Sequence, residues 1–121
     1  MAEAGCSQLG QLYGTDVWGI VVFVEAPLFT RLVSRYMGDD EYCGLQWSLV
    51  LNPNAGKLIR GSGGIRKLRW TATGRGKRGG LRIVYYLRTR DEIWLLSIYA
   101  KNEAQDLSAE ILRALRKEIE R

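Results

Sequence analysis

The sequence predicts a small α+β domain with helices packed on an antiparallel sheet. Two early segments and the last segment space their hydrophobic residues with the helical period of 3.6. Three segments in the second half are rich in β-branched and aromatic residues or alternate in character, as strands do. The connections between these strands are short, which favours an antiparallel meander. The length of 121 residues suits one domain that can bury a core.

The first half is predicted to contain one strand followed by two helices. The segment Trp18–Glu25 is β-branched and aromatic, as a buried strand is. A helix begins at Pro27, whose fixed φ suits the first helical position. A second helix, capped by Asp39 or Asp40, runs to Leu51. The residues at helical spacing in these two segments are Leu28, Leu32, Arg35 and Tyr36, then Tyr42, Leu45, Leu49 and Val50.

The second half is predicted to contain three strands and a helix. The expected strands are Ile65–Trp70, Leu81–Leu87 and Ile93–Lys101. A helix over Leu107–Arg121, capped by Ser108, closes the chain. Its expected inward residues are Ile111, Leu112, Leu115 and Ile119. The economical arrangement places the helices on one face of the sheet and leaves a basic face opposite.

We expect residues 1–17 to be a disordered extension and residues 18–121 to form the domain. The extension has no basic region before an apolar stretch, so it does not resemble a signal peptide. The longest apolar run, Trp18–Val24, is too short to span a membrane. The two cysteines, Cys6 and Cys43, are typical of a reducing cytoplasm.

Positive charge is concentrated in the middle of the chain. Between Lys57 and Arg90 there are 11 basic residues and no acidic one. The segments before and after this stretch each carry more acidic than basic residues, and the net charge is +5. Such clustering is destabilised by self-repulsion unless a polyanion offsets it, and nucleic acid is the commonest polyanion. A generic solvated basic face is the alternative.

Several classes of chemistry are excluded or disfavoured. The sequence has no histidine, which removes His-based acid–base catalysis and most zinc sites. Clustered carboxylates for a catalytic metal are also lacking, so no metal or other cofactor is expected. The segment Gly74–Gly79 matches G-x-G-x-x-G, but a strand follows it where a dinucleotide site needs a helix. We expect this loop to approach phosphates through Arg75, Lys77 and Arg78; a flexible hairpin loop is the alternative.

Strand alternation predicts one face that is rich in cations. If Leu68 points to the core, five residues share the opposite face: Lys67, Arg69, Arg82, Tyr99 and Lys101. Arg66 then lies on the side of Leu68, near an edge, and a slip of one residue would expose Trp70 instead. Tyr86 shares the face of Arg82 and could stack a base. In the last strand, Trp94, Leu96, Ile98 and Ala100 are expected on the face away from Tyr99.

These side chains could cleave RNA without a metal. The RNA 2′-hydroxyl can attack its own phosphate if a base takes its proton, and a lysine crowded by other cations can be that base. An arginine can hold the extra negative charge through two parallel hydrogen bonds. A second cation or a tyrosine could protonate the leaving oxygen. A binding surface without chemistry is the alternative.

Six segments in this order resemble the HigB branch of the RelE toxin superfamily, over roughly residues 20–120. They are Asp40-Glu-Tyr42, Asn52-Pro53, Gly61-Ser-Gly-Gly-Ile-Arg-Lys-Leu-Arg-Trp70, Gly74-Arg-Gly-Lys-Arg-Gly-Gly-Leu-Arg-Ile-Val-Tyr-Tyr86, Tyr99-Ala-Lys-Asn-Glu103 and Asp106-Leu-Ser108. The resemblance implies the toxin of a type II toxin–antitoxin system. It further implies a ribosome-dependent endoribonuclease that cuts mRNA in the decoding site. The implied fold is a small antiparallel sheet with two helices after the first strand and one at the end.

The resemblance also implies roles for individual residues. The family's basic strand corresponds to Lys67 and Arg69, with Arg66 as a further candidate. The family's phosphate-stabilising arginine matches Arg82, and the lysine that ends its last strand matches Lys101. Relatives have an arginine after that lysine and a tyrosine further on. Here Asn102 takes the first position and Ser108 or Leu107 the second, so Tyr99 or Tyr86 is left as the tyrosine.

The resemblance implies a helix-turn-helix antitoxin as partner, with operator DNA bound only through the antitoxin. The other expected partners are mRNA and the ribosome, in the cytoplasm and away from membranes. A non-catalytic RNA- or ribosome-binding module of the same fold remains the alternative. A DNA-binding regulator is disfavoured because no predicted helix carries a basic face for reading DNA.

Overall fold

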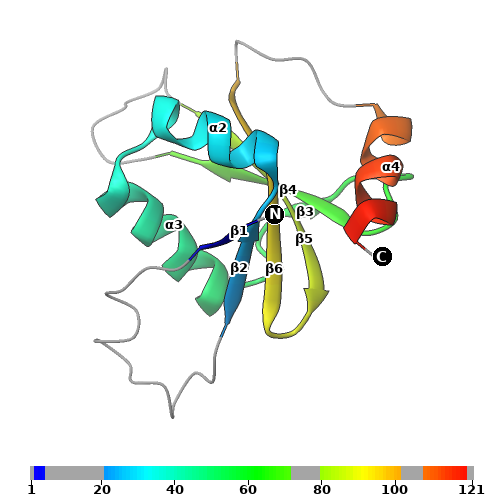
Figure 1. The fold of residues 1–121 in the computed structure, drawn as a ribbon, viewed down its shortest axis with the longest axis horizontal. Coiled ribbons are helices and arrows are strands. Elements are labelled where there is room, and N and C mark those ends of the chain that lie inside the picture. Colours follow the sequence, from blue (N-terminus) through cyan, green and yellow to red (C-terminus); the bar gives the residue numbers. More distant parts are fainter. Residues whose placement is uncertain (1, 5–20, 72–79, 102–107, 120–121) are drawn as a thin grey trace.

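The computed structural model describes residues 2–4, 21–71, 80–101 and 108–119, which form an α+β fold (Figure 1). Its helices are α2 (Pro27–Tyr36), α3 (Asp39–Leu51) and α4 (Ala109–Ile119). Its strands are β1 (Ala2–Ala4), β2 (Val22–Glu25), β3 (Lys57–Leu58), β4 (Ile65–Trp70), β5 (Leu81–Thr89) and β6 (Glu92–Ala100). The α+β class agrees with the sequence prediction, and the predicted strand, two helices, three strands and helix occur in that order with two further strands among them. Strands β1 and β3 were not predicted, and β1 lies inside the segment expected to be disordered.

The two early helices begin where their sequences indicate. Pro27 occupies the first turn of α2, where its missing N–H costs nothing. The prediction that Asp39 or Asp40 caps α3 is wrong, because Gly38 is the N-cap and no side chain bonds to the helix end. The acidic residues instead lie in the first turn, where the helix dipole stabilises negative charge.

Helix α4 is capped by Ser108 as predicted. The Ser108 hydroxyl accepts the backbone N–H of Ile111 at 3.2 Å. Leu112 and Ile119 are buried, and Leu115 packs beside them. The prediction that Ile111 faces inward is wrong, because its side chain is 51% exposed. Ile111 precedes Leu112 by one residue and therefore projects about 100° away from it around the helix.

The described strands form one sheet in the order β1-β2-β6-β5-β4-β3. Strands β4, β5 and β6 make the predicted antiparallel meander. The sheet is nevertheless mixed rather than antiparallel, because β2 pairs with β6 in parallel. This pairing joins segments that are far apart in sequence, and local hydrophobic patterns carry no information about such a pairing. The prediction of a wholly antiparallel sheet is therefore wrong at β2.

The sheet is covered by helices on both faces, with a separate core on each side (Figure 1). The first core joins α2 and α3 to the sheet through Phe29, Leu45 and Leu49, packed with Leu68, Leu81, Ile83 and Tyr85. The second core joins α4 to the sheet through Leu112 and Ile119, packed with Ile65, Val84, Tyr86, Leu96 and Tyr99. The expectation that all helices lie on one face is wrong, because α4 covers part of the face predicted to be basic.

A bulge in the β5–β6 pairing changes the faces of the last strand. The register shifts between Val84 and Tyr85, so that Val84 pairs with Ser97 and Tyr86 pairs with Trp94. Trp94 and Leu96 consequently pack in the core that contains Tyr99. The prediction that they face away from Tyr99 is wrong, because an extra residue in one strand reverses the alternation beyond it.

A buried tyrosine ties the turn after α3 to the sheet. The Tyr85 hydroxyl donates to the backbone oxygen of Pro53 at 2.8 Å and accepts the N–H of Gly56 at 2.8 Å. Burial raises the pKa of Tyr85, so the phenol stays protonated and keeps both bonds. Gly56 is pressed against the ring, since a Cβ there would lie 2.7 Å from Cε1 of Tyr85.

Cys43 in α3 is disulfide-bonded, and Cys6 lies outside the described residues. A disulfide is typical of an oxidising compartment, so the interpretation of the cysteines as a sign of reducing cytoplasm stays a prediction. In the described parts of the chain, no helix is both long enough and apolar enough to cross a membrane.

Replacing Gly56 with alanine is expected to destabilise the fold by about 1–3 kcal/mol, because the new methyl overpacks the Tyr85 ring. The matched control is Gly44→Ala in α3, where a Cβ meets nothing within 4 Å. That change should stabilise the helix by up to about 1 kcal/mol. Urea denaturation followed by tryptophan fluorescence measures both. Equal effects of the two substitutions would contradict the close contact at Gly56.

Candidate functional site

Three adjacent strands place Arg69, Arg82 and Tyr99 side by side. Arg69 of β4 pairs with Arg82 of β5, and Arg82 pairs with Tyr99 of β6. Directly paired residues share a face, with Cβ atoms about 5 Å apart. We call these residues the Arg69–Arg82–Tyr99 row. Two guanidinium groups in directly opposed positions repel each other, so an anion bound between them would remove a destabilising interaction.

Two lysines flank this row. Lys67 precedes Arg69 by two residues on β4 and pairs with Val84, so it shares the face of the row. Lys101 follows β6 directly, and its backbone N–H donates to the oxygen of Gly80 at 2.9 Å. This bond holds Lys101 beside the start of β5, where Arg82 lies. The register therefore confirms that Lys67 shares a face with the row, and it places Lys101 at the same end of the sheet.

The Arg82 side chain folds back along its own strand. Its Nη1 donates to the backbone oxygen of Leu81 at 3.2 Å. A Cβ at Gly80 would lie 3.2 Å from the same nitrogen, so glycine leaves the space that the guanidinium occupies. Arg82 remains partly exposed. The backbone of β5 thus fixes one nitrogen of this guanidinium near the surface.

The two tyrosines predicted on this face are both buried. Tyr99 is 8% exposed and Tyr86 is 9% exposed. The guanidinium carbon of Arg116 lies 5.8 Å from the centre of the Tyr86 ring. The prediction that Tyr86 stacks an RNA base therefore fails in this conformation, because α4 covers the ring. Sequence alternation identified the face of Tyr86 but not the helix packed over it.

Arg66 lies on the opposite face from Lys67 and Arg69. Its Nη1 donates to the backbone oxygen of Gly56 at 2.7 Å and to that of Asn54 at 3.4 Å. Leu68 is buried in the first core, and Trp70 packs against the same core and donates to Glu41 at 3.1 Å. These contacts settle the register in favour of Leu68 facing inward. They also remove Arg66 from the basic face, because its guanidinium secures the turn before β3.

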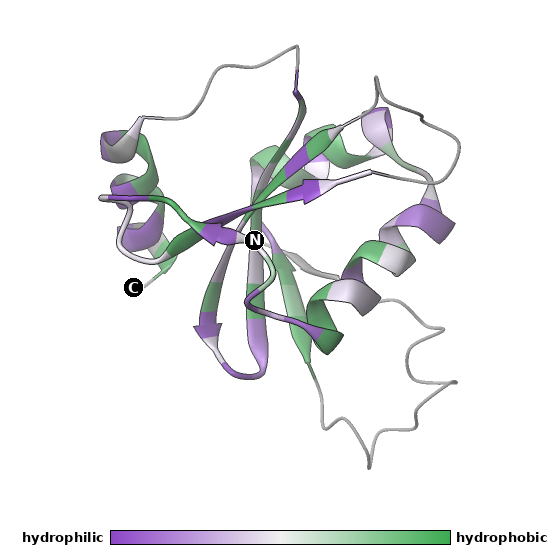
Figure 2. Cartoon of the chain, turned by 180° about the vertical axis from the view of Figure 1, so that it is seen from behind, coloured by the Kyte–Doolittle hydropathy of each residue, from purple (hydrophilic) through white to green (hydrophobic). Residues whose placement is uncertain are grey.

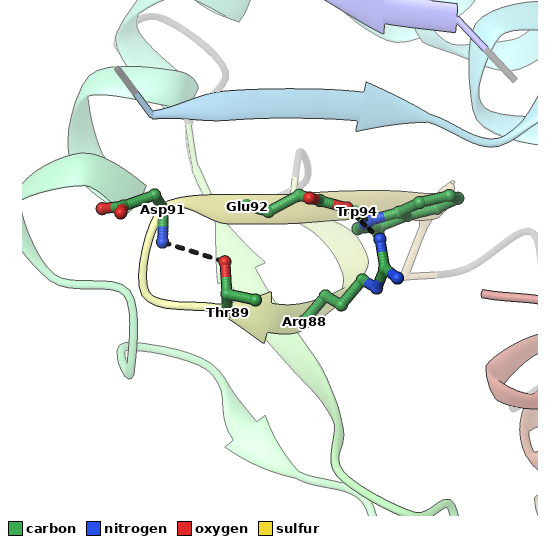
Figure 3. Close-up of polar contacts among 5 residues, drawn as sticks. All are labelled: Arg88, Thr89, Asp91, Glu92 and Trp94. Carbon is green, nitrogen blue, oxygen red and sulfur yellow. Dashed lines mark hydrogen bonds and ion pairs between the residues drawn. The ribbon is translucent and has the colours of Figure 1, made fainter. Parts of the chain in front are cut away.

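Arg88 lies at the other end of β5, about 20 Å from Arg82 along the strand. Its guanidinium is paired with Glu92 at 3.1 Å, and Glu92 also accepts the indole N–H of Trp94 (Figure 3). The β5–β6 hairpin around this cluster is hydrophilic (Figure 2). Arg88 is therefore a cation engaged within the hairpin and does not belong to the row.

The basic loop residues Arg75, Lys77 and Arg78 lie outside the described residues. Sequence reasoning missed Arg116, which the sequence analysis did not single out. A signal was available, because Leu112, Leu115, Arg116 and Ile119 have the i, i+3, i+4, i+7 spacing of one helix face. That spacing places Arg116 at the border of the buried side of α4.

The assembled side chains can bind and stabilise an anion. The row and its flanking lysines supply guanidinium, ammonium and phenol groups. Among the residues that the structure describes, no group of three or more His, Cys, Asp or Glu is placed to hold a metal ion. No protein-family model matches the chain.

Replacing Arg66 with methionine is expected to cost about 1–3 kcal/mol of stability, because the oxygens of Gly56 and Asn54 lose a charged donor. Arg69→Met, on the same strand but exposed, should change stability by less than about 0.5 kcal/mol. Urea denaturation compares the two. Similar losses in both variants would show that Arg66 does not secure this turn.

The Glu92 cluster predicts a pH-dependent stability difference. The Trp94 indole and the Arg88 guanidinium lower the pKa of Glu92 below its ordinary value of 4.5. The resulting stabilisation is fully present above pH 4.5 and is lost as pH falls through the lowered pKa. Wild type should exceed Glu92→Gln in stability at pH 7, and urea denaturation at falling pH should show the difference shrink. The carboxylate of Asp91 points away from the cluster (Figure 3), so Asp91→Asn serves as control. A difference independent of pH would contradict this assignment.

Proposed function

We propose that this chain is a ribosome-dependent mRNA endoribonuclease, the toxin of a type II toxin–antitoxin system in the HigB branch of the RelE superfamily. The observation that carries the proposal is the Arg69–Arg82–Tyr99 row with Lys67 and Lys101 beside it. This constellation was expected from the sequence on the basis of RNA cleavage chemistry and of the resemblance. The pairing of β4, β5 and β6 brings the residues of the row together, and this observation is independent of the resemblance.

The proposed reaction is a metal-free transesterification. A base removes the proton of the RNA 2′-hydroxyl, and the resulting oxygen attacks the adjacent phosphorus. The bond from phosphorus to the 5′-oxygen of the next nucleotide breaks, and an acid protonates that oxygen. The products are a 2′,3′-cyclic phosphate and a 5′-hydroxyl. In the proposal, Arg82 holds the charge that develops on the phosphate, while Lys67, Lys101 and Tyr99 are the candidate base and acid.

Dependence on the ribosome is consistent with the small number of acid–base groups in the site. Tyr99 is largely buried, and no histidine is present. A site with few acid–base groups benefits when its substrate is held in a reactive geometry by another body, because positioning alone can supply a large part of a rate enhancement. In the proposal the ribosome positions the mRNA, and the toxin supplies positive charge and proton transfer.

The implied partners are mRNA, the decoding site of the ribosome and a helix-turn-helix antitoxin, with operator DNA bound through the antitoxin alone. Ribosomes place the activity in the cytoplasm. The Cys43 disulfide does not support this location. No cofactor is proposed.

A non-catalytic RNA- or ribosome-binding module is the second candidate. The burial of both Tyr86 and Tyr99 favours it, because it leaves fewer groups available to transfer a proton. The two candidates differ in their dependence on guanidinium geometry. Binding requires positive charge, whereas cleavage also requires the bidentate donors that lysine lacks.

Primer extension on a reporter mRNA in a cell-free bacterial translation system tests the proposal. Wild type should produce new 5′ ends only when ribosomes are present. Arg82→Ala and Arg82→Lys should each reduce cleavage by about a hundredfold or more, since one charge-stabilising donor contributes that much. Arg82→Lys should still bind programmed ribosomes.

Arg90→Ala is the control, because Arg90 is exposed at the turn between β5 and β6, far from the row, and its loss should leave cleavage unchanged. Arrested translation without new 5′ ends would favour the binding module. Cleavage of free RNA, or cleavage unaffected by Arg82→Ala, would contradict the proposed mechanism.

A further inference from the structure

The Tyr86 ring lies close to both the glycine turn before β4 and an arginine of α4. A Cβ at Gly64 would lie 3.3 Å from Cε1 of Tyr86. The Arg116 guanidinium carbon stands 5.8 Å from the centre of the same ring. A guanidinium over an aromatic face is held by cation–π attraction. The aromatic surface that the sequence predicted for RNA is thus presented to Arg116.

Three features fix Arg116 in this position. Its helix is anchored by Leu112, Leu115 and Ile119 in the second core. Its Cδ fills the space that a side chain at Gly63 would need, since a Cβ there would lie only 2.5 Å away. Gly63 has a φ of 83°, a conformation that favours glycine. Arg113, one turn earlier, donates to the backbone oxygen of Gly61 at 3.3 Å.

Arg116 packs against its neighbours but is not enclosed. Its Nε is shielded from solvent, while the side chain as a whole is partly exposed. An arginine whose stem and ring contact are already ordered loses little conformational entropy when its outer nitrogens bind an anion. The geometry is therefore that of a pre-organised anion ligand.

Arg116 also lies next to the basic face. Tyr86 pairs with Ile65, and Lys67 follows Ile65 by two residues on the same face, about 7 Å further along β4. Beyond Lys67 come Arg69 and Arg82. Positive groups consequently continue from α4 across the sheet face to the Arg69–Arg82–Tyr99 row.

We propose that Arg116 is a phosphate ligand for the RNA strand. It binds in the region of the surface where the sequence predicted a contact between RNA and Tyr86. This inference rests on the proposed function and extends it, because it names a contact outside the row. Tyr86 serves as the platform that orients the guanidinium. The RNA backbone then runs from the row past Lys67 to the border of α4.

The test measures how strongly RNA affinity depends on salt. The probe is a fluorescein-labelled single-stranded RNA with 2′-O-methyl groups, which cannot be cleaved. Its binding is followed by anisotropy, and by co-sedimentation with ribosomes programmed with it, over a series of potassium chloride concentrations. Arg116→Met keeps the apolar stem on Tyr86 and removes the charge. Arg116→Lys keeps the charge, and Arg90→Met is the matched control at the hairpin tip.

Loss of one phosphate contact should make the negative slope of log K against log salt shallower by about 0.7 for a single strand. We expect this change in Arg116→Met and not in Arg116→Lys or Arg90→Met. Equal slopes in Arg116→Met and Arg90→Met would overturn this inference but leave the proposed function in place. Weaker binding with an unchanged slope would overturn it too, because it would mean that Arg116 only fastens α4.

A second measurement does not depend on the folding of a variant. Phenylglyoxal modifies exposed arginines, and mass spectrometry of the wild-type protein locates the modification. RNA should protect Arg116 more strongly than Arg90, and equal protection would overturn the inference. Wild type that binds neither free RNA nor programmed ribosomes would overturn the proposed function, and the inference with it.

Discussion

The register of β5 against its two neighbours is the constraint on which the remaining structure depends. β5 pairs with β4 on one side and β6 on the other, so its alternation determines which residues enter each core. Leu81, Ile83 and Tyr85 enter the core beneath α2 and α3, while Val84 and Tyr86 enter the core beneath α4. A slip of one residue would exchange these sets and bury Arg82 among apolar groups. The burial that stabilises the fold therefore also keeps Arg82 at the surface.

The α4 side of the sheet divides into two regions with different chemistry. Near Ile65 and Tyr86 the face is apolar and covered by the helix. Near Arg69 and Arg82 it carries charge. Lys67 lies between the two regions, and the buried Tyr99 extends the second core toward the charged end. Because α4 occupies one region, the exposed positive charge of this face is confined to the other, and Arg116 stands at the boundary. In the proposed function, the helix would limit the surface available to RNA and add a cation to it.

Prediction from sequence succeeded where the relevant forces are local. Alternation placed Lys67, Arg69 and Arg82 on one face, because the strands are regular over those residues. It failed at Trp94 and Leu96, where a bulge inserts a residue that no composition signal marks. It assigned Arg66 to its correct side but could not show that the guanidinium binds the oxygen of Gly56. Alternation placed Tyr86 on the correct face but predicted that its ring is exposed to RNA. The ring is buried beneath α4 instead, and this burial depends on a contact between distant segments.

The sequence by itself determined the α+β class, the bounds of the main helices and strands to within a few residues, and the concentration of positive charge between Lys57 and Arg90. Each of these follows from spacing, capping and composition, which act over one or two turns of chain. Tertiary structure decided that β2 joins β6 in parallel, that α4 covers the second face, and that Arg116 stands over Tyr86. These outcomes depend on which hydrophobic surfaces meet. The hydrophobic effect is non-directional and does not distinguish one apolar partner from another. The pairing of surfaces is therefore decided by the packing of the whole chain.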